Sequence, residues 1–591
     1  MKRKHLIVTL VIGIFFLLTY QNLAANAENL IYKEVTAAPG DTSTELQNLL
    51  DFNKHGKYNL TVIIPSGEYL LNKEMRIYSN TTIQADKNAK FLKNHQRGAM
   101  LANDLTNDKG GYNTAKNITV MGGIWDSSRV AALDKGTESL RFIHTTDVTI
   151  KNLTVSNVPN GSHMITFAGV TNGTIENCTL YGYGGTMLKE AIQLDIVHDN
   201  IVVPSMQEDH LTYDDLACSN ILITGCNIYD YSRAIGSHTS VKGVYHKNIT
   251  IHNNKLHDLQ DTAIKAYNYI NLKVSNNTIY NAAMGILVYT YIGNEKGHYL
   301  EALGTTKQVP LPANYNIIIK NNTIYDIVKS QSTSTATWGD AIHTIGNSSR
   351  PLSGVTIYNN TIRDIGRYGI FLEGTTGSTI SRNKVTNTTN SGIYAISGSH
   401  YAKINDNILQ KTGLLSQNAG GIGLNASKGA SILNNSITYP GKNGIFLYSK
   451  SNQSKISNNT ITYPGENAIA LYSQSNDAEV TSNIIKYYGI NGIFTYGIKS
   501  ANISGNKIYG KNTGNSKDGI HISGDNSKST KFTVNKNYIK TSRRNAIYVD
   551  LAPKAAISNN TIINSIKTAI FLGKGSTNSK LTSNKITISA K

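Results

Sequence analysis

The sequence predicts an all-β fold, a parallel β-helix (solenoid) that follows a small N-terminal cap. One short phrase recurs along the chain: Ala or Gly, then Ile, then an alternating strand, as in Gly369–Glu373, Gly444–Tyr448 and Ala569–Gly573. A second phrase, built on a pair of Asn residues, precedes most copies. Its second Asn recurs mostly every 23 or 24 residues between Asn254 and Asn584. A period near 23 with short β-branched strands and Asn or Gly turns is typical of stacked β-coils.

Residues 1–27 have the pattern of a secretory signal peptide. Lys2, Arg3 and Lys4 give a charged start, Leu6 to Tyr20 is almost wholly apolar, and Ala25-Asn26-Ala27 is a small-x-small cleavage site. An uncleaved membrane anchor is the alternative, although the apolar run is short for a span. We therefore expect a secreted, extracellular protein with no membrane span once the signal is cleaved.

Residues 28–100 are predicted to form the N-terminal cap. Gly40-Asp41-Thr42 offers a polar N-cap for a short helix over Glu45–Leu50, and Val62–Tyr69 has the pattern strand, turn, strand. Such a cap covers the strand edges that an open repeat end exposes. The β-helix follows over 101–591, with loop insertions near 196–217 and 291–315.

Each coil is expected to point its Ile, and the residue two later, into the interior, with the residue between them facing outward. The Asn column is interpreted as structural, because Asn tolerates left-handed turns and bonds to its own copy one coil away. Cys178, Cys218 and Cys226 are too few for a disulfide framework, and we expect them to pack in the interior.

The charge balance points to a polyanionic partner. Lys and Arg total 57 against 38 Asp and Glu, a formal net charge of +19. A basic exported protein suits an acidic polysaccharide or a cell-envelope polymer, although solubility alone explains the charge equally well. Nucleic acid is not expected, since export argues against it and no recognition motif is present.

Ionisable residues concentrate in the coils between about 138 and 268. Strands one coil apart bring outward side chains within roughly 5–8 Å of one another, which is the scale of an active-site groove. The outward column contains Arg141, Thr166, Gln193 and Lys265. The turn that enters each strand contains Glu138, His163, Glu190 and Arg233. Three residues after the inward position come Asp195, His238, Tyr267 and Tyr289. His343 and His521, further along, are interpreted as incidental.

The segment 189–215 is acidic, in contrast to the rest of the chain. Lys189 is its single base, and its acids are Glu190, Asp195, Asp199, Glu208, Asp209, Asp214 and Asp215. These acids supply a catalytic carboxylate, bind calcium through oxygen ligands, or solvate a loop. Calcium is thus the one ion left open, and no other cofactor is indicated.

Three phrases resemble the pectate-lyase and polygalacturonase superfamily of right-handed β-helix proteins: Gly40–Gln47, Ile64–Tyr69 and Gly122–Asp126. The resemblance implies a right-handed helix that acts on polysaccharides. Polygalacturonases carry an Asp-Asp pair, a Ser/Gly-His-Gly and an Arg-Ile-Lys. Here Asp214-Asp215, Ser237-His238 and Ile264-Lys265 occur in the same order, with Thr239 in place of the final Gly of the histidine motif.

The mixture of basic, His and Tyr residues favours lyase or 5-epimerase chemistry on a uronate polysaccharide. Arg233 and Lys265 suit neutralisation of the uronate carboxylate, His238 or His163 suits the base at carbon 5, and Tyr267 suits the acid. The alternative for Arg233 is a salt bridge to Glu190 of the neighbouring coil. The alternative is polygalacturonase-like hydrolysis by two carboxylates. The residues that supply them in that case are Glu190, Asp195, Asp214 and Asp215.

The remaining candidates are expected to contact the polysaccharide. With His163, this group comprises Arg141, Gln193, Tyr213, His246 and Tyr289. A second alternative is a non-catalytic rod that binds polysaccharide or mediates surface adhesion, in which the polar cluster is only a binding groove.

Overall fold

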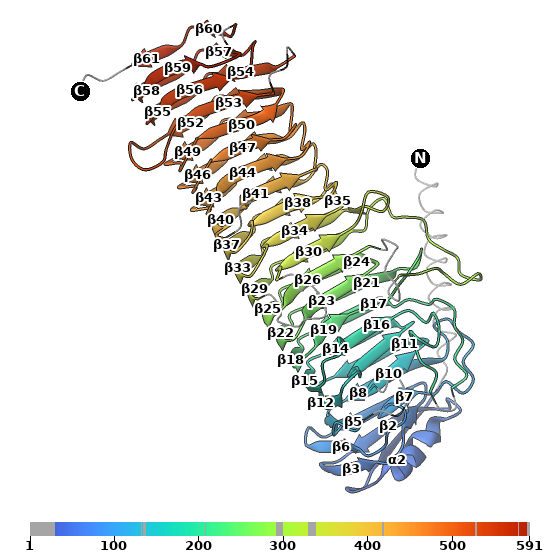
Figure 1. Cartoon of the computed structure of the whole chain (residues 1–591). Coiled ribbons are helices and arrows are strands. Elements are labelled where there is room, and N and C mark those ends of the chain that lie inside the picture. The colour runs from blue at the N-terminus through green and yellow to red at the C-terminus, as the bar shows by residue number, and fades with distance from the viewer. Residues whose placement is uncertain are drawn as a thin grey trace, which may run out of the picture.

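The computed structural model describes residues 30–131, 133, 138–206, 209–290, 299–328, 339–415, 419–525, 527, 529–576 and 578–587. The described chain forms a rod of stacked parallel coils, with the cap at one end and the C-terminal coils at the other (Figure 1). The predicted all-β parallel β-helix is confirmed. The predicted signal at 1–27, Glu208 and residues 291–298 of the second insertion lie outside the described residues.

Each coil contributes one strand to each of three parallel sheets, which we call sheets A, B and C. Sheet A runs the length of the rod and contains β1 (Ile31–Thr36), β2 (Tyr58–Ile64), β5 (Thr81–Ala85), β8 (Ala115–Met121), β11 (Thr145–Lys151), β14 (Thr171–Glu176), β17 (Ser219–Thr224), β21 (His246–His252), β24 (Tyr269–Ser275), β28 (Ile317–Lys320), β32 (Val355–Tyr358), β36 (Thr379–Ser381), β39 (Lys403–Asn405), β42 (Ser431–Leu433), β45 (Lys455–Ser457), β48 (Ala478–Thr481), β51 (Ser500–Ser504), β54 (Lys531–Asn535), β57 (Ala556–Ser558) and β60 (Lys580–Thr582).

Sheet B contains β3 (Gly67–Leu71), β6 (Ala89–Lys93), β9 (Ile124–Asp126), β12 (Thr154–Pro159), β15 (Thr179–Gly184), β18 (Asn227–Tyr231), β22 (Lys255–Leu259), β25 (Thr278–Ala282), β29 (Thr323–Ile327), β33 (Thr361–Ile365), β37 (Lys384–Thr388), β40 (Ile408–Thr412), β43 (Ser436–Thr438), β46 (Thr460–Thr462), β49 (Ile484–Lys486), β52 (Lys507–Tyr509), β55 (Tyr538–Ser542), β58 (Thr561–Ser565) and β61 (Lys585–Thr587).

Sheet C carries the recurring Ile phrase and every cluster discussed below. It contains β4 (Met75–Ile77), β7 (Leu101–Asn103), β10 (Leu140–Ile143), β13 (Ile165–Ala168), β16 (Glu190–Asp195), β19 (Arg233–Gly236), β23 (Thr262–Tyr267), β26 (Met284–Tyr289), β30 (Ile342–Ile345), β34 (Ile370–Glu373), β38 (Ile393–Ile396), β41 (Gly420–Asn425), β44 (Asn443–Tyr448), β47 (Ile469–Tyr472), β50 (Ile493–Ile498), β53 (Ile520–Gly524), β56 (Asn545–Asp550) and β59 (Thr568–Leu572).

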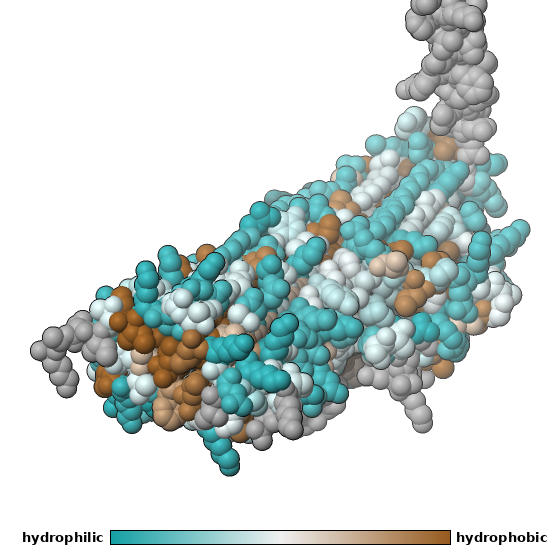
Figure 2. All heavy atoms as spheres, turned by 90° about the horizontal axis from the view of Figure 1, so that it is seen from above, coloured by the Kyte–Doolittle hydropathy of each residue, from teal (hydrophilic) through white to brown (hydrophobic). Residues whose placement is uncertain are grey.

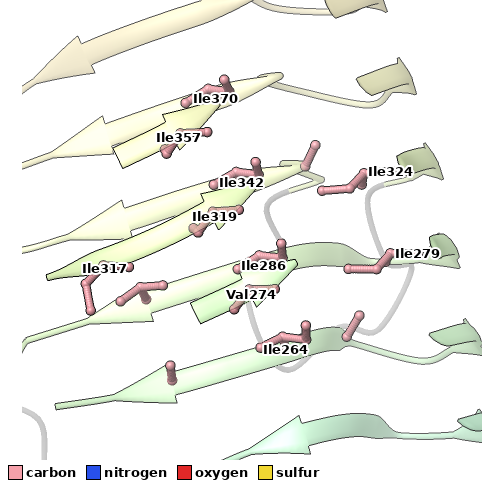
Figure 3. Packing of buried hydrophobic residues seen from close by; sticks show 14 of the residues in the cluster. Ile264, Val274, Ile279, Ile286, Ile317, Ile319, Ile324, Ile342, Ile357 and Ile370 are labelled. Carbon is pink, nitrogen blue, oxygen red and sulfur yellow. The ribbon is translucent and has the colours of Figure 1, made fainter. Parts of the chain in front are cut away.

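The interior is a column of stacked aliphatic side chains. Ile264, Ile286, Ile342 and Ile370 follow one another in register on successive strands of sheet C, and each is fully buried (Figure 3). Burial of each such side chain contributes about 1.5–3 kcal/mol. The predicted inward positions are therefore confirmed, and the residue after each of them is the outward one.

The Asn column is a continuous internal hydrogen-bond ladder. Asn407 donates both its backbone N–H and its Nδ2 to Asn435 Oδ1 at 3.0 Å, and Asn435 does the same to Asn459 at 2.9 Å. Each Nδ2 also donates to a carbonyl of the preceding coil. The column is therefore structural, as expected, and the three cysteines are buried and unpaired.

The cap consists of β1 and a short helix, α2 (Ser43–Leu50), which runs into the 3₁₀ turn η1 (Asp51–Asn53). Thr42 and Glu45 form a capping box at the start of α2, and Leu46 and Leu50 are buried against the first coil. The parallel coils begin earlier than the predicted boundary at residue 101. β2 already pairs with β5, and β5 with β8, because Val62–Tyr69 supplies strands of the first coil.

Both insertions fold back onto the rod. The loop over residues 196–217 is closed by an antiparallel bridge between Val197 and Leu216. In the second insertion, β27 (Tyr299–Leu300) pairs with β20 (Ser240–Val241), and further along the rod β31 (Leu352–Ser353) pairs with β35 (Thr375–Thr376). None of the described helices has the length and apolar character needed to cross a bilayer.

The face of the rod seen from above is largely hydrophilic. Polar side chains run along it, and apolar ones gather mainly near one end (Figure 2). The last coils expose several large apolar side chains, namely Ile566, Phe571, Leu581 and Ile586.

Candidate active site

A pocket of about 400 Å³ lies over sheet C in the coils where ionisable residues concentrate. Its polar wall comprises Glu138, Ser162, His163, Lys189, Gln193 and His238. Ile201, Val202 and Pro204, from the first insertion, line the pocket on another side, and the exposed Leu133 and Met187 complete an apolar rim. A few convergent polar groups with an apolar rim are typical of a ligand site.

Two histidines face the pocket with the same ring nitrogen anchored. His163 Nδ1 lies 2.6 Å from the Glu190 carbonyl oxygen, and His238 Nδ1 lies 3.2 Å from Glu190 Oε2. The Glu190 carbonyl can only accept, so His163 Nδ1 donates and its Nε2 carries the lone pair. His238 Nδ1 also lies 3.3 Å from the Gln193 amide nitrogen, but the charged Glu190 carboxylate is the stronger partner and favours the same tautomer. The rings are parallel, with centroids 5.8 Å apart.

Both histidines are held in the neutral, basic form. Burial, followed by the charge of Lys189, holds the pKa of His163 well below its usual range. Burial likewise lowers the pKa of His238, even though the Glu190 carboxylate beside it acts in the opposite direction. Each ring therefore has a basic Nε2 at neutral pH.

Glu190 is an ionised group beneath the pocket. It is fully buried, and its Oε1 accepts from Arg233 at 3.1 Å. Burial opposes its charge, but the hydrogen bond from His238 and the Arg233 guanidinium hold the pKa of Glu190 well below its usual range. Arg233 Nε also donates to Asp261 at 2.5 Å, and burial cannot offset these carboxylates, so the pKa of Arg233 is raised.

Two carboxyl groups in the same coils favour the protonated form. Burial raises the pKa of Glu138, which lines the pocket and whose Oε2 makes no hydrogen bond within the described residues. Burial and the Glu190 charge raise the pKa of Asp195, whose Oδ2 contacts the Gln193 amide. Groups whose environments push their pKa values apart, such as His163 and Glu138, are candidates for base and acid.

Lysine and tyrosine side chains extend the cluster along sheet C. Lys189 lines the pocket, and its charge contributes to the lowered pKa of His163. Lys265 lies in register with Gly236, and its Nζ lies 4.6 Å from the centroid of the Tyr267 ring. Tyr267 and Tyr289 contact each other edge to face at 4.7 Å. The structure thus brings the predicted basic and tyrosine residues onto one face.

Other predicted residues instead anchor the first insertion. Arg141 is buried under it, bonded to Asp209 at 3.0 Å and to the Pro204 carbonyl at 2.5 Å. Asp214 Oδ1 accepts from His144, whose other nitrogen bonds to Asp108.

Asp215 and Tyr213 complete this anchoring. Asp215 bonds to His198 and accepts from the backbone of Leu303 and the hydroxyl of Thr306, which belong to the second insertion. Tyr213 contacts Asn200 within the loop. These two side chains shape the covering loops, through contacts with His198, Leu303, Thr306 and Asn200.

Two predicted roles need correction. His246 was expected to bind substrate, but it is fully buried in the interior, accepts from the Cys218 N–H and contacts the Tyr269 ring. Arg233 was expected to neutralise a substrate carboxylate, but its guanidinium pairs with Glu190 and Asp261 beneath the pocket. Its charge stabilises the site and is not presented to a ligand.

Within the described residues, one group has the spacing of metal ligands: His163, Glu190 and His238, whose ligand atoms lie within 4.8 Å of one another. Two nitrogens and one carboxylate suit zinc-like ions, whereas calcium prefers oxygen ligands. Arg233 lies 3.1 Å from Glu190 Oε1 and opposes a second cation there. The acids of 189–215 that the structure describes are dispersed: Glu190, Asp209, Asp214 and Asp215 pair with cations or histidines.

Sequence reasoning gave no role to several residues that line the pocket. Glu138 was noted in an ionisable column and Lys189 in the acidic segment, and neither received a role. The signal available in the sequence was that Glu138 and Lys189 lie two or three residues before the inward residues Leu140 and Ile192. The loop residues Ile201, Val202 and Pro204 carried no signal, because the path of an insertion does not follow from the repeat.

The family described as a right-handed β-helix region matches residues 109–290, 215–350, 330–461 and 467–588. Comparison with curated proteins gives no match.

Among solved structures, PfbA, a surface adhesin of Streptococcus pneumoniae, is 16% identical over 79% of this chain and 93% of that one, with a TM-score of 0.38. A hyperthermoactive exopolygalacturonase from Thermotoga maritima is 13% identical over 68% and 92%, with a TM-score of 0.40. The A-module of the Azotobacter vinelandii mannuronan C-5 epimerase AlgE6 is 13% identical over 93% and 96%, with a TM-score of 0.27. At these values the activities of those proteins are theirs alone.

Proposed function

The chain belongs to the right-handed β-helix family, and from its pocket we propose that it is a secreted enzyme that modifies an acidic, uronate-type polysaccharide by lyase or 5-epimerase chemistry. One observation carries the proposal. The pocket combines neutral histidines of fixed tautomer, a carboxyl group with a raised pKa and a lysine. A purely structural groove does not need that combination.

His163 is the base in this mechanism. Its Nδ1–H is held by the Glu190 carbonyl, so Nε2 is the nitrogen available to take the proton from carbon 5 of a uronate. Its lowered pKa keeps it unprotonated at neutral pH. His238 has the same tautomer and is the alternative base for an approach from its side of the pocket.

Lys189 and Glu138 complete the chemistry. A cation near the uronate carboxylate stabilises the anion that forms when the carbon 5 proton leaves. Lys189 supplies that charge, with Lys265 further along the sheet. Glu138 then donates a proton, either to the leaving glycosidic oxygen in a lyase or back to carbon 5 in an epimerase.

The experiment is incubation of the purified protein with polygalacturonate and with alginate. A new ultraviolet absorbance from an unsaturated product identifies a lyase, and solvent deuterium at carbon 5 without chain cleavage identifies an epimerase. New reducing ends without absorbance identify the hydrolase alternative. If none of these signals appears on either polymer, the proposed activity is wrong and a binding rod remains.

The matched variants are His163→Gln and His257→Gln. His257 serves as the control, because it is another histidine whose ring stacks in a row of tyrosines but lies on sheet B. Loss of a general base costs typically 10²–10⁴-fold in rate, so His163→Gln should fall by about that factor and His257→Gln should not. If His163→Gln and the equivalent His238→Gln both keep full activity, the assignment of a histidine as the base is wrong.

Secretion and cleavage are part of the same proposal and have their own test. The pattern at 1–27 predicts that the protein recovered from the culture medium begins at Glu28. N-terminal mass spectrometry of the medium and membrane fractions decides this. A full-length chain retained in the membrane would instead identify an anchor.

A further inference from the structure

One column of turn residues changes its residue type part of the way along the rod. The column lies at the end of the sheet B strands, where the chain turns toward sheet C, and its members adopt a left-handed backbone. Asp and Asn accept this backbone most readily, since their short polar side chains bond locally. In six successive coils the column holds only these two types, with φ between 48° and 58°: Asp230, Asp258, Asn281, Asp326, Asp364 and Asn387.

Three consecutive tyrosines occupy the same column further along. After Lys411, the next coils place Tyr439, Tyr463 and Tyr487 there, with φ of 53°, 54° and 58°. The coil that follows them has Gly510 at this position. A left-handed backbone is unfavourable for a bulky side chain, and strain of this kind is characteristic of functional sites. The column therefore gives up its favoured residue type at three places in a row.

The three rings form one exposed stack along the rod, hereafter the tyrosine patch. Their centroids are 4.9 Å apart at both steps, with interplanar angles of 4° and 22°. Tyr439, Tyr463 and Tyr487 are 48%, 41% and 39% exposed. The strands that precede them, β43, β46 and β49, lie one above another along one edge of the rod (Figure 1). Stacking recovers part of the cost of the backbone, but it leaves much of each ring in water.

The area of the tyrosine patch suits a weak contact with another molecule. An aromatic side chain buries about 150–250 Å² when it is fully covered, so the exposed parts of the three rings offer on the order of 250 Å². Leu414 lies beside Gly441, two residues after Tyr439, and Leu414 and Leu415 are 42% and 80% exposed. They extend the apolar area. A standard protein interface buries about 800 Å² on each partner, so we expect a contact that depends on concentration.

Repeat and symmetry identify a second copy of this chain as the occupant. A partner that contacts all three rings presents groups about 4.9 Å apart, which is the spacing of the stacked coils themselves. Three equally spaced rings also map onto themselves about a twofold axis through the central one, Tyr463. Tyr439 then faces Tyr487 of the second copy, and the two Tyr463 rings face each other, as in a closed, isologous dimer.

The charges around the patch permit this pairing. The chain has a formal net charge of +19, so two copies repel each other unless the contact is locally neutral. Lys442 and Glu466, in the same turns, neutralise each other at 2.9 Å. Lys411, the neighbour of Tyr439 in the column, falls opposite Gly510 of the second copy, which has no side chain.

We propose that the tyrosine patch is a homodimer interface, in which two rods lie side by side and antiparallel with Tyr463 on the twofold axis. The inference makes no use of the proposed enzymatic activity. Variants of the patch leave every residue of the pocket unchanged, so the two proposals fail separately.

Analytical ultracentrifugation of the full chain tests the dimer. The wild type should shift from monomer to dimer as its concentration rises. Tyr463→Asn should weaken the dimer about tenfold or more, because each dimer loses two central rings. Asn restores the residue type of the column, so the variant should fold, which thermal unfolding of the dilute protein checks. The control is Tyr280→Asn, which removes a ring from the sheet B row, stacked at 4.7 and 4.9 Å on its neighbours, and should leave association unchanged.

Ionic strength gives a second readout. Salt screens the repulsion between two positively charged copies and leaves apolar contacts intact, so the dimer should become tighter as salt rises. A dimer that becomes weaker in salt is held by charges, and the tyrosine patch is then not its interface.

Cross-linking decides the symmetry. The three native cysteines are buried. Oxidised glutathione should therefore link Tyr463→Cys into a covalent dimer on its own, whereas Tyr439→Cys should link efficiently only when it is mixed with Tyr487→Cys.

Four results would overturn the proposal. The first is a wild type that stays monomeric at every concentration, and the second is a Tyr463→Asn variant that dimerises as tightly as the wild type. The third is a Tyr463→Cys variant that cross-links no better than Tyr325→Cys on sheet B. The fourth is a monomeric chain that uses these tyrosines to bind a polysaccharide or a different protein.

Discussion

His144 is predicted to make closure of the first insertion over the pocket dependent on pH. The fully buried ring bonds to Asp108 through Nδ1 at 2.8 Å and to Asp214 through Nε2 at 3.2 Å. Burial opposes protonation, but the two carboxylates outweigh it and raise the pKa of His144 to about 9. These acids also accept the N–H groups of Thr212 and Gly111, which tie the loop to the first coils.

The magnitude follows from the difference between the two states. A rise from an open-state pKa of 6.5 to about 9 corresponds to roughly 3 kcal/mol, at about 1.4 kcal/mol per pKa unit. Because the pKa is raised in the closed state, this stabilisation is complete below pH 6.5 and is lost as pH rises through 9. The Asp108 pKa, lowered to about 2 by the His144 and Thr114 hydrogen bonds against burial, keeps that acid ionised throughout.

The assay is limited proteolysis of residues 196–217, with hydrogen exchange of the same segment, from pH 6 to 10.5. The wild-type loop should open progressively above pH 6.5, by a factor that approaches about 300-fold at pH 10.5. His144→Gln cannot carry the charge, so its loop should already be open by a similar factor at pH 7 and should show a flatter profile. Equal cleavage rates for wild type and variant at pH 7, or a wild-type rate constant to pH 10.5, would refute the reasoning.

Three further outcomes are expected. Arg233→Met leaves the Glu190 carboxylate buried without its cation, and should lower the free energy of unfolding in denaturant by about 3–5 kcal/mol. The double variant with Glu190→Gln should recover most of that loss. A loss below about 1 kcal/mol would contradict the ion network. Asn435→Ala should lower the free energy of unfolding by roughly 1–3 kcal/mol for each ladder group that is left without its hydrogen-bond partner. The control is Lys403→Ala, which removes an exposed side chain on the previous coil and should leave that free energy nearly unchanged. Dialysis against a chelator should leave turnover unchanged, because Arg233 opposes a cation at Glu190; loss that calcium or zinc restores would show otherwise.

The fold was predictable because it depends on local periodicity. The alternation around each Ile and the recurrence of Asn435 and its copies state directly which side chains point inward. The register of the outward column also followed, so the neighbours Gln193, Gly236 and Lys265 were placed correctly. What the period could not give was the start of the coils, since the first ones lack the Asn phrase.

The candidate site was predictable only in part. Glu190, Arg233, His238 and His163 were expected on one face, and the structure brings them together. His163, Glu190 and Arg233 occupy equivalent positions on successive coils, and His238 lies five residues after Arg233. Their division of labour was predictable only in part. The pairing of Arg233 with Glu190 was one of the two alternatives for Arg233, and the strand register confirms it. The pairing of Asp214 with His144 and of Asp215 with His198 was not predictable, because it depends on the path of the insertion.

The sequence by itself determined the solenoid and the inward and outward columns of its coils, since these follow from a 23-residue period and the two-residue alternation of a strand. Only the tertiary structure decided which polar residues form a pocket. The insertion at 196–217 crosses the coils, buries Arg141 and His144, and covers the groove, and such contacts join residues far apart in the chain. The same is true of His343 and His521, which look isolated in the sequence and gain Glu373 and Asp550 as neighbours only because the next coil stacks on theirs.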